Sequence, residues 1–205
     1  MILKKQIGSA ATPMHCCITT SVVHIKVGVW IIKYGLIGRG EIMNRGLYLY
    51  KEFIEIARSL NQQLDIVPVL YGSLGLGIVA KVDFTPQDID ILVPLTYLEE
   101  KWGVFQYTME QLGYSMVNLQ EHEFVKNDIT IGFAFTEDLL EFANVDYTNL
   151  NEFEDNGSEY YLLTITDYVN VYNKSLQDGY RRTKNNNKDL KKVQILNNII
   201  QTQND

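Results

Sequence analysis

Two short apolar runs, residues 66–71 and 89–93, most constrain how this 205-residue chain can fold. Both are short, contain several β-branched residues and end at Gly, Pro or Asp, which is typical of buried strands. Gly72-Ser73 follows the first run, and Asp88 precedes the second. Pro68 has no N–H to donate, so we expect the first strand to lie at a sheet edge or a bulge. The chain therefore builds a sheet with polar groups at its strand ends.

Helices are expected before, between and after these strands. Apolar residues recur at helical spacing over 45–61, and Thr96 and Glu99 have the spacing of a capping box. We also expect helices over 74–81, 96–112, 136–142, 166–177 and 188–200, strands over 114–119, 121–125, 129–135 and 160–164, and an acidic loop over 144–159. This pattern predicts an α+β fold (α/β in the broad sense) with a mixed sheet, flanking helices and a C-terminal helical tail.

The composition limits the partners and the compartment. There are 25 acidic and 18 basic residues, so the net charge of −7 provides no long-range field for duplex nucleic acid. The adjacent Cys16 and Cys17 would pair only with strain, which favours a reducing cytoplasm. Charged residues interrupt the apolar stretch over 18–37, so we expect no membrane contact, with an anchor as the minor alternative.

The first 42 residues differ in composition from the rest. The run from Gly38 to Met43 reads GRGEIM, which a purine-rich ribosome-binding site followed by ATG can encode. We therefore expect residues 1–42 to be a translated leader or non-native extension, and residues 43–205 to form a single domain. A folded N-terminal strand or helix is the alternative.

Asp88 and Asp90 carry the clearest chemical signal. Residues two apart in a strand point to the same face, so these two carboxylates lie together. A divalent cation relieves their repulsion, and oxygen ligands suit Mg²⁺ that is bound partly through substrate phosphates. Gly72 permits a tight turn, and Ser73 with the next N–H groups at a helix start can receive phosphate oxygens. A solvated strand start and a simple turn are the alternatives for the two features taken separately.

The order strand, Gly-Ser, short helix, Asp-x-Asp, strand runs through YGSLGLGIVAKVDFTPQDIDILVP (residues 71–94). This arrangement resembles the nucleotidyltransferase superfamily, whose members share a polymerase-beta-like core. The resemblance extends to about residue 200, where Asn187-Lys188-Asp189-Leu190 is similar to a step that opens a late helix in small members. Residues 175–189 also resemble a tail in small bacterial members.

The resemblance implies a role for each matching residue. Asp88 and Asp90 would be catalytic and ligate Mg²⁺, Gly72 and Ser73 would hold the triphosphate, and Lys188 would contact phosphate. The basic cluster of Arg181, Arg182 and Lys184 is either an aid to phosphate binding or, more simply, a solvated helix end.

The family also supplies a third carboxylate from a later strand, which helps to activate the attacking hydroxyl. The apolar face of residues 129–135 is made of Ile129, Ile131, Phe133 and Phe135, and the opposite face carries Thr130 and Gly132. Asp128 at the strand start is therefore assigned as the third catalytic acid. Glu121 or Glu123 on the paired strand is the alternative, whereas His122 is expected on the sheet surface without a catalytic role.

The function implied is an Mg²⁺-dependent transfer of a nucleoside monophosphate from a nucleoside triphosphate to an acceptor. The acceptor stays open between a small molecule, a protein side chain and an RNA end. One alternative is a catalytically inactive nucleotidyltransferase-like module that binds a nucleotide or a protein partner. Another is one half of a toxin–antitoxin type pair.

Overall fold

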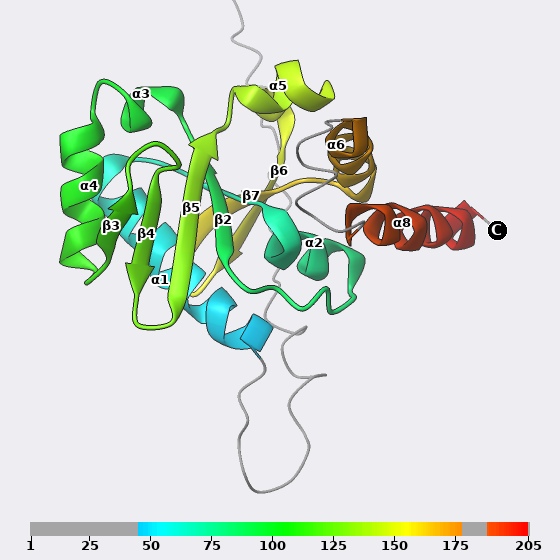
Figure 1. Cartoon of the computed structure of the whole chain (residues 1–205), viewed down its shortest axis with the longest axis horizontal. Helices are drawn as coiled ribbons and strands as arrows, with labels where there is room; N and C mark the ends of the chain where they lie inside the picture. The colour runs from blue at the N-terminus through cyan, green and yellow to red at the C-terminus, as the bar shows by residue number, and fades with distance from the viewer. Residues whose placement is uncertain (1–44, 178–187, 205) are drawn as a thin grey trace, which may run out of the picture.

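The computed structural model describes residues 45–177 and 188–204. Residues 1–42, expected to be a leader, lie outside the described part of the chain, as do Arg181, Arg182 and Lys184. A mixed sheet with helices on both faces fills the described part, which confirms the predicted α+β class (Figure 1).

The sheet has seven strands in the order β3-β4-β5-β2-β1-β7-β6. The pairs β2–β5 and β1–β7 are parallel and the other neighbours are antiparallel. The strands are β1 (Val69–Leu70), β2 (Ile89–Val93), β3 (Ser115–Asn118), β4 (Glu123–Lys126), β5 (Ile129–Phe135), β6 (Asn151–Asp155) and β7 (Ser158–Leu162). The bounds of β2 and β5 are those that their apolar patterns predict.

The helices divide between the two faces of this sheet. They are α1 (Arg45–Leu64), α2 (Gly72–Ala80), α3 (Leu95–Leu98), α4 (Trp102–Gln111), α5 (Asp138–Ala143), α6 (Ile165–Gln177) and α8 (Lys188–Asn204), with a 3₁₀ turn η3 (Tyr147–Asn149). Figure 1 shows α1 behind the strands, and α2, α6 and α8 gathered at one side of the sheet. No helix of the described residues is long and apolar enough to cross a membrane.

Each face of the sheet has its own core, and β2 contributes to both. Ile89 and Ile91 point to the face covered by α1 and α4, where they pack with Phe53, Phe105 and other buried residues. Leu92 points to the opposite face and packs among residues of α2, α5, α6 and α8. Because side chains alternate along a strand, Asp90 lies on this second face, and Asp88 is exposed in the bend directly before β2.

The predicted edge position of the first strand is wrong. β1 lies inside the sheet between β2 and β7, and its register begins at Val69, after the proline. Pro68 is buried directly before β1, and its carbonyl accepts the N–H of Tyr161 at 2.8 Å. The proline therefore contributes an acceptor to the sheet at a position where the missing N–H is not required.

The predicted acidic loop over 144–159 is also wrong, because it contains η3, β6 and the start of β7. In this hairpin Glu152, Glu154 and Glu159 are exposed, whereas Phe153 and Tyr160 pack inward. The alternation of acidic and aromatic residues is thus a strand pattern with one solvated face.

The predicted helix over 96–112 is interrupted, and its capping box does not form. The chain forms α3 and α4 as separate helices, and α3 begins at Leu95, which places Thr96 inside the helix. Glu137 accepts the N–H of Leu95 at 3.0 Å, so an acid from the approach to α5 caps this helix. A capping box forms instead at α6, where Thr164 Oγ1 accepts the N–H of Asp167 and Asp167 accepts the N–H of Thr164.

Candidate functional site

The start of α2 lies directly against the carboxylate of Asp90. Gly72 follows β1 with a φ of +62°, in the left-handed region. A Cβ built on Gly72 would lie 1.7 Å from Asp90 Oδ2, a separation that real atoms do not reach. The N–H of Tyr71 donates to the Asp90 carbonyl at 2.9 Å, which fixes the turn to β2. Only glycine fits between the strand end and this carboxylate.

The N-terminus of α2 therefore faces the same region as Asp90. Gly75 N–H donates to the Tyr71 carbonyl at 3.1 Å and closes the first helical turn. The N–H groups of the residues before it have no partner within the helix itself, and the helix dipole makes this end attractive to anions. Ser73, half-buried in this first turn, adds a hydroxyl.

A lysine from α8 completes the local arrangement. Lys192 Nζ donates to Ser73 Oγ at 3.1 Å and to the Tyr172 hydroxyl at 3.3 Å. The ammonium group also lies over the Tyr172 ring, 4.5 Å from its centroid. The Lys192 side chain is only 16% exposed, so its charge is held within the fold beside the Gly-Ser turn.

Buried partners fix the position of Lys192. Asp189, one turn earlier in α8, forms an ion pair with Lys192 at 3.6 Å and accepts the Ser175 hydroxyl of α6 at 2.8 Å. Tyr168 of α6 stacks on both Tyr71 and Tyr172, with centroid separations of 6.3 and 6.1 Å. The helices α6 and α8 thus form a polar and aromatic wall next to the start of α2.

The electrostatics link this wall to both predicted metal ligands. Burial lowers the pKa of Lys192, and the negative charges of Asp189, Asp90 and Asp88 raise it in part. Burial likewise raises the pKa of the Tyr172 hydroxyl well above its usual value, and Tyr71, Asp189, Asp90 and Asp88 add to that rise. Asp88 and Asp90 are therefore near enough to act on both Lys192 and Tyr172.

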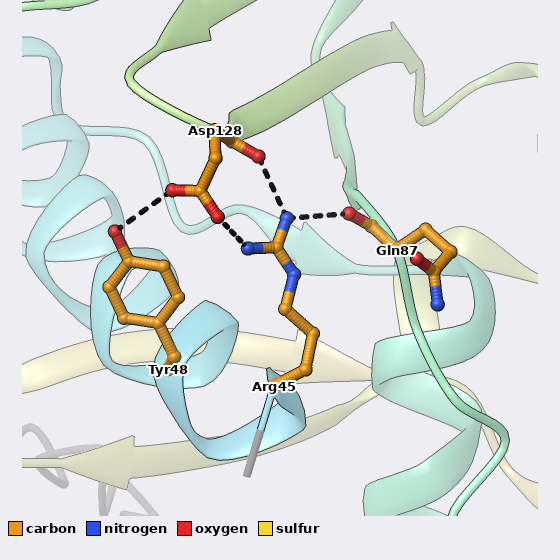
Figure 2. A network of polar contacts seen from close by, with 4 residues as sticks. All are labelled: Arg45, Tyr48, Gln87 and Asp128. Carbon is orange, nitrogen blue, oxygen red and sulfur yellow. Dashed lines mark hydrogen bonds and ion pairs between the residues drawn. The ribbon is translucent and has the colours of Figure 1, made fainter. Parts of the chain in front are cut away.

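Two of the predicted site residues lie apart from this arrangement. Lys188, the first residue of α8, is exposed and donates no hydrogen bond to any described residue. Asp128 lies in the β4–β5 turn and forms an ion pair with Arg45 of α1 (Figure 2). Because Asp90 pairs in register with Gly132, Asp128 lies roughly 13 Å further back along the chain of β5.

The alternatives for a third acid have different positions. Gly132 is the β5 neighbour of Asp90, and on its other side Gly132 pairs with Glu123 of β4. Glu123 therefore lies in the same cross-strand row as Gly132 and Asp90, and its side chain is half-exposed. Glu121 lies in the turn before β4 and is exposed. His122, in that same turn, is half-buried and packs against Trp102 of α4 and Phe135 of β5.

The donor set suits a cation that takes further ligands from its substrate. No group of three His, Cys, Asp or Glu residues that could enclose a metal occurs within 45–177 and 188–204. Asp90 in β2 and Asp88 directly before it offer hard oxygen ligands, with the anion-attracting start of α2 beside Asp90. Magnesium is often held in this manner, by one or two carboxylates together with substrate phosphates.

Sequence reasoning missed Lys192 and Tyr172. The signal for Lys192 lay in its helical spacing, because it is three residues after Asp189 and four before Leu196, both of which are buried. The motif match points to Lys188, which lies one turn earlier in α8. Tyr172 shares a helical stripe with Tyr168 and Ser175, and all three are buried.

Comparison with known proteins gives one informative match. No family model matches the chain, and no solved structure matches it. A protein of Bacillus subtilis (strain 168), named uncharacterized protein YnaI, is 57% identical over 152 residues. The alignment covers 74% of this chain and 97% of that protein. Its name does not state a ligand or a reaction.

Proposed function

This chain belongs to the same family as Bacillus subtilis YnaI, and we propose that it is a cytoplasmic, Mg²⁺-dependent nucleotidyltransferase. The contact between Gly72 and the Asp90 carboxylate carries the proposal. It brings an anion-attracting helix start next to a pair of hard oxygen ligands. Together these two features suit a triphosphate with its magnesium ion.

Each residue of the site has a defined task in this proposal. Asp88 and Asp90 hold Mg²⁺, which neutralises phosphate charge and the charge of the leaving pyrophosphate. The N–H groups at the start of α2 and the Ser73 hydroxyl bind phosphate oxygens. Lys192 turns from Ser73 to the triphosphate, a role that the sequence assigned to Lys188. Tyr172 of α6 holds Lys192 in place, and Tyr168 of α6 stacks on Tyr71 at the start of α2.

The reaction transfers a nucleoside monophosphate. The acceptor hydroxyl oxygen forms a bond to the α-phosphorus, and the bond from the α-phosphorus to the α–β bridging oxygen breaks. Pyrophosphate leaves with the electron pair of that bond. The hydroxyl proton passes to a carboxylate, for which Glu123 is suited because it shares a row of the sheet with Asp90.

The acceptor approaches over the open half of the sheet. In Figure 1 none of the described helices lies in front of β3, β4 or β5. On this side Thr130, Gly132 and Glu123 are half-exposed and Ala134 is exposed, and Gly132 pairs directly with Asp90. Room for an acceptor thus lies next to the carboxylates, opposite the wall formed by α6 and α8.

The test measures binding and turnover separately. The purified protein is titrated calorimetrically with ATP, GTP, CTP and UTP in the presence of Mg²⁺, and pyrophosphate release is then followed with α-labelled nucleotide. Small-molecule, protein and RNA fractions of a host extract serve as acceptors. We expect D88N and D90N to lose turnover in every fraction. Wild-type turnover in both variants would show that these carboxylates are not the metal ligands.

A second function has support from one observation. Gly132 occupies the β5 position beside Asp90, where a side chain would point toward the metal ligands, and glycine supplies no carboxylate. A module that binds a nucleotide or a protein partner without transfer, including one half of a toxin–antitoxin type pair, is compatible with this. Nucleotide binding without pyrophosphate release in any acceptor fraction, or a stoichiometric partner recovered by affinity capture, would favour it.

A further inference from the structure

Arg45 forms hydrogen bonds that join α1 to the segment before β2 and to the β4–β5 turn. Arg45, in the first turn of α1, donates from Nη2 to the Gln87 carbonyl at 3.0 Å and to the Asp128 carbonyl at 2.8 Å. Its Nη1 pairs with the Asp128 carboxylate, and Tyr48 Oη lies 3.5 Å from the other carboxylate oxygen. Figure 2 shows the guanidinium group between Asp128 and the Gln87 carbonyl.

The contact with Gln87 acts directly on Asp88. The Gln87 carbonyl and the Asp88 N–H belong to one planar peptide unit, so holding the carbonyl fixes the plane from which the Asp88 backbone continues. In the segment that leads to this unit, Val82 and Phe84 pack against the core and Pro86 is buried, whereas the residues between and after them face solvent. Asp83, Thr85 and Gln87 are exposed, and Thr85 has a φ of +49°.

The chemistry of arginine suits this task. Its planar fork presents several N–H groups in fixed directions, so one side chain bonds two carbonyls and a carboxylate together. Asp128 anchors the fork at the β4–β5 turn, which lies beside the start of β2 because β5 and β2 are paired. Lysine, with a single ammonium group on a flexible stem, cannot hold the same three acceptors in this geometry.

We propose that the Arg45–Asp128 pair is a positioning clamp for Asp88, which raises the affinity of the Asp88–Asp90 pair for a divalent cation. The clamp rests on the proposed function, because it requires these carboxylates to bind such a cation. Asp128 is then a positioning residue that acts through Arg45 and the Gln87 carbonyl. It touches neither the cation nor the nucleotide.

The chain provides a matched control in Arg58. This arginine also lies in α1, pairs with Glu55 and donates to the carbonyl of Asn156 at 3.1 Å, in the β6–β7 turn. Its side chain is 30% exposed, compared with 33% for Arg45. The two arginines therefore fasten α1 to turns in similar ways, but only Arg45 bonds to the peptide unit of Asp88.

The experiment titrates Mn²⁺ alone into the full chain and measures free Mn²⁺ by electron paramagnetic resonance. We expect R45A to raise the Mn²⁺ dissociation constant about tenfold, as the loss of a group that orients a metal ligand commonly does. D128A and R45K should raise it by less, and R58A should leave it within twofold. Thermal unfolding of R45A and R58A, measured alongside, shows whether the two variants lose similar stability.

The outcomes separate the clamp from the proposed function. If D88N and D90N abolish Mn²⁺ binding while R45A, R45K and D128A bind as the wild type does, the clamp is wrong and the metal site stands. If the wild type binds no Mn²⁺, both are wrong. Should R45A fail to fold, R45K and D128A decide the question, because each retains part of the contact.

Discussion

Lys192 of α8 donates a hydrogen bond to Ser73 of α2 at 3.1 Å, across 119 residues of sequence. The contact joins the helical tail to the turn that follows β1. It also places a partly buried ammonium group near Asp88 and Asp90, whose charges act on its pKa. The candidate site is therefore assembled from α2, β2 and α8, and not from the residues 71–94 alone.

Replacing Lys192 tests its role toward phosphate. We expect K192M to weaken binding of Mg²⁺–ATP about 10- to 100-fold, because hydrogen bonds to charged groups each contribute roughly 1.5–3 kcal/mol. Methionine keeps most of the apolar stem, and Asp189 keeps its bond from Ser175. The exposed Lys188 is the control, and K188M should bind as the wild type does in the same calorimetric titration. Equal losses in both variants would point to a general effect of charge.

Gly72 should tolerate no side chain. The G72A variant combines a φ of +62° with a Cβ that would lie 1.7 Å from Asp90 Oδ2, so either the turn or the carboxylate must move. We expect a lower melting temperature and loss of Mn²⁺ binding. In G132A the new Cβ would lie 3.8 Å from Asp90 Oδ1, an ordinary contact, so Mn²⁺ binding should persist. Wild-type metal affinity in G72A would contradict the close approach.

Replacing Glu123 of β4 tests whether it is the third acid of the site. If Glu123 accepts the proton of the acceptor hydroxyl, E123Q should slow turnover about 10²- to 10⁴-fold and leave nucleotide binding unchanged. Glu121, two residues earlier in the turn, is the matched control, and E121Q should keep the wild-type rate. Pyrophosphate release and calorimetry supply the two readouts. An E123Q variant with full turnover would remove Glu123 from the reaction.

The buried tyrosines predict a loss of stability at alkaline pH. Burial raises the pKa of Tyr160 from 10.0 to about 12, with a smaller upward effect from Asp155 and an opposing one from the hydrogen bond with Tyr50. Above pH 10 the unfolded chain releases this proton while the folded chain retains it. The contribution of Tyr160 to the free energy of unfolding should therefore be constant below pH 10 and fall between pH 10 and 12.

Urea unfolding over this pH range measures the effect. Y160F should flatten the decline by up to about 1.4 kcal/mol per pH unit, the contribution of one linked proton. Tyr107 is 60% exposed, so Y107F should decline as the wild type does. If Y160F and the wild type fall in parallel, the Tyr160 hydroxyl does not retain its proton in the folded chain.

Much of the fold could be predicted because its signals are local. The strands β2 and β5 follow from alternating or continuous apolar residues, and α1 follows from its helical periodicity. β6 and the first two residues of β7 were missed because acidic side chains on one face hid the alternation, whereas the rest of β7 lies in the strand predicted over 160–164. The position of Pro68 in a central part of the sheet depends on β7, some ninety residues later in the chain, where the Tyr161 N–H donates to the Pro68 carbonyl.

The candidate site also divides into residues with local sequence signals and residues whose contacts depend on distant segments. Gly72, Ser73, Asp88 and Asp90 lie within one short stretch, where turn chemistry and strand alternation show which groups meet. The contacts of Lys192 and Asp128 could be found only from the tertiary structure. The contact of Lys192 depends on how α8 docks against α6, and that of Asp128 on an arginine 83 residues earlier in the chain. No local pattern distinguishes Asp128 beside a metal from Asp128 beside Arg45.

The contact between α2 and α8 also has a consequence for biosynthesis. Ribosomes make the Gly-Ser turn and both β2 carboxylates long before Lys192, which follows Ser73 by 119 residues. During that interval the nascent chain carries Asp88 and Asp90 without this ammonium group beside them. The site therefore acquires its balance of charge only when α8 has left the ribosome and docked, so a chain released early would hold the carboxylates in an electrostatic setting unlike that of the finished protein.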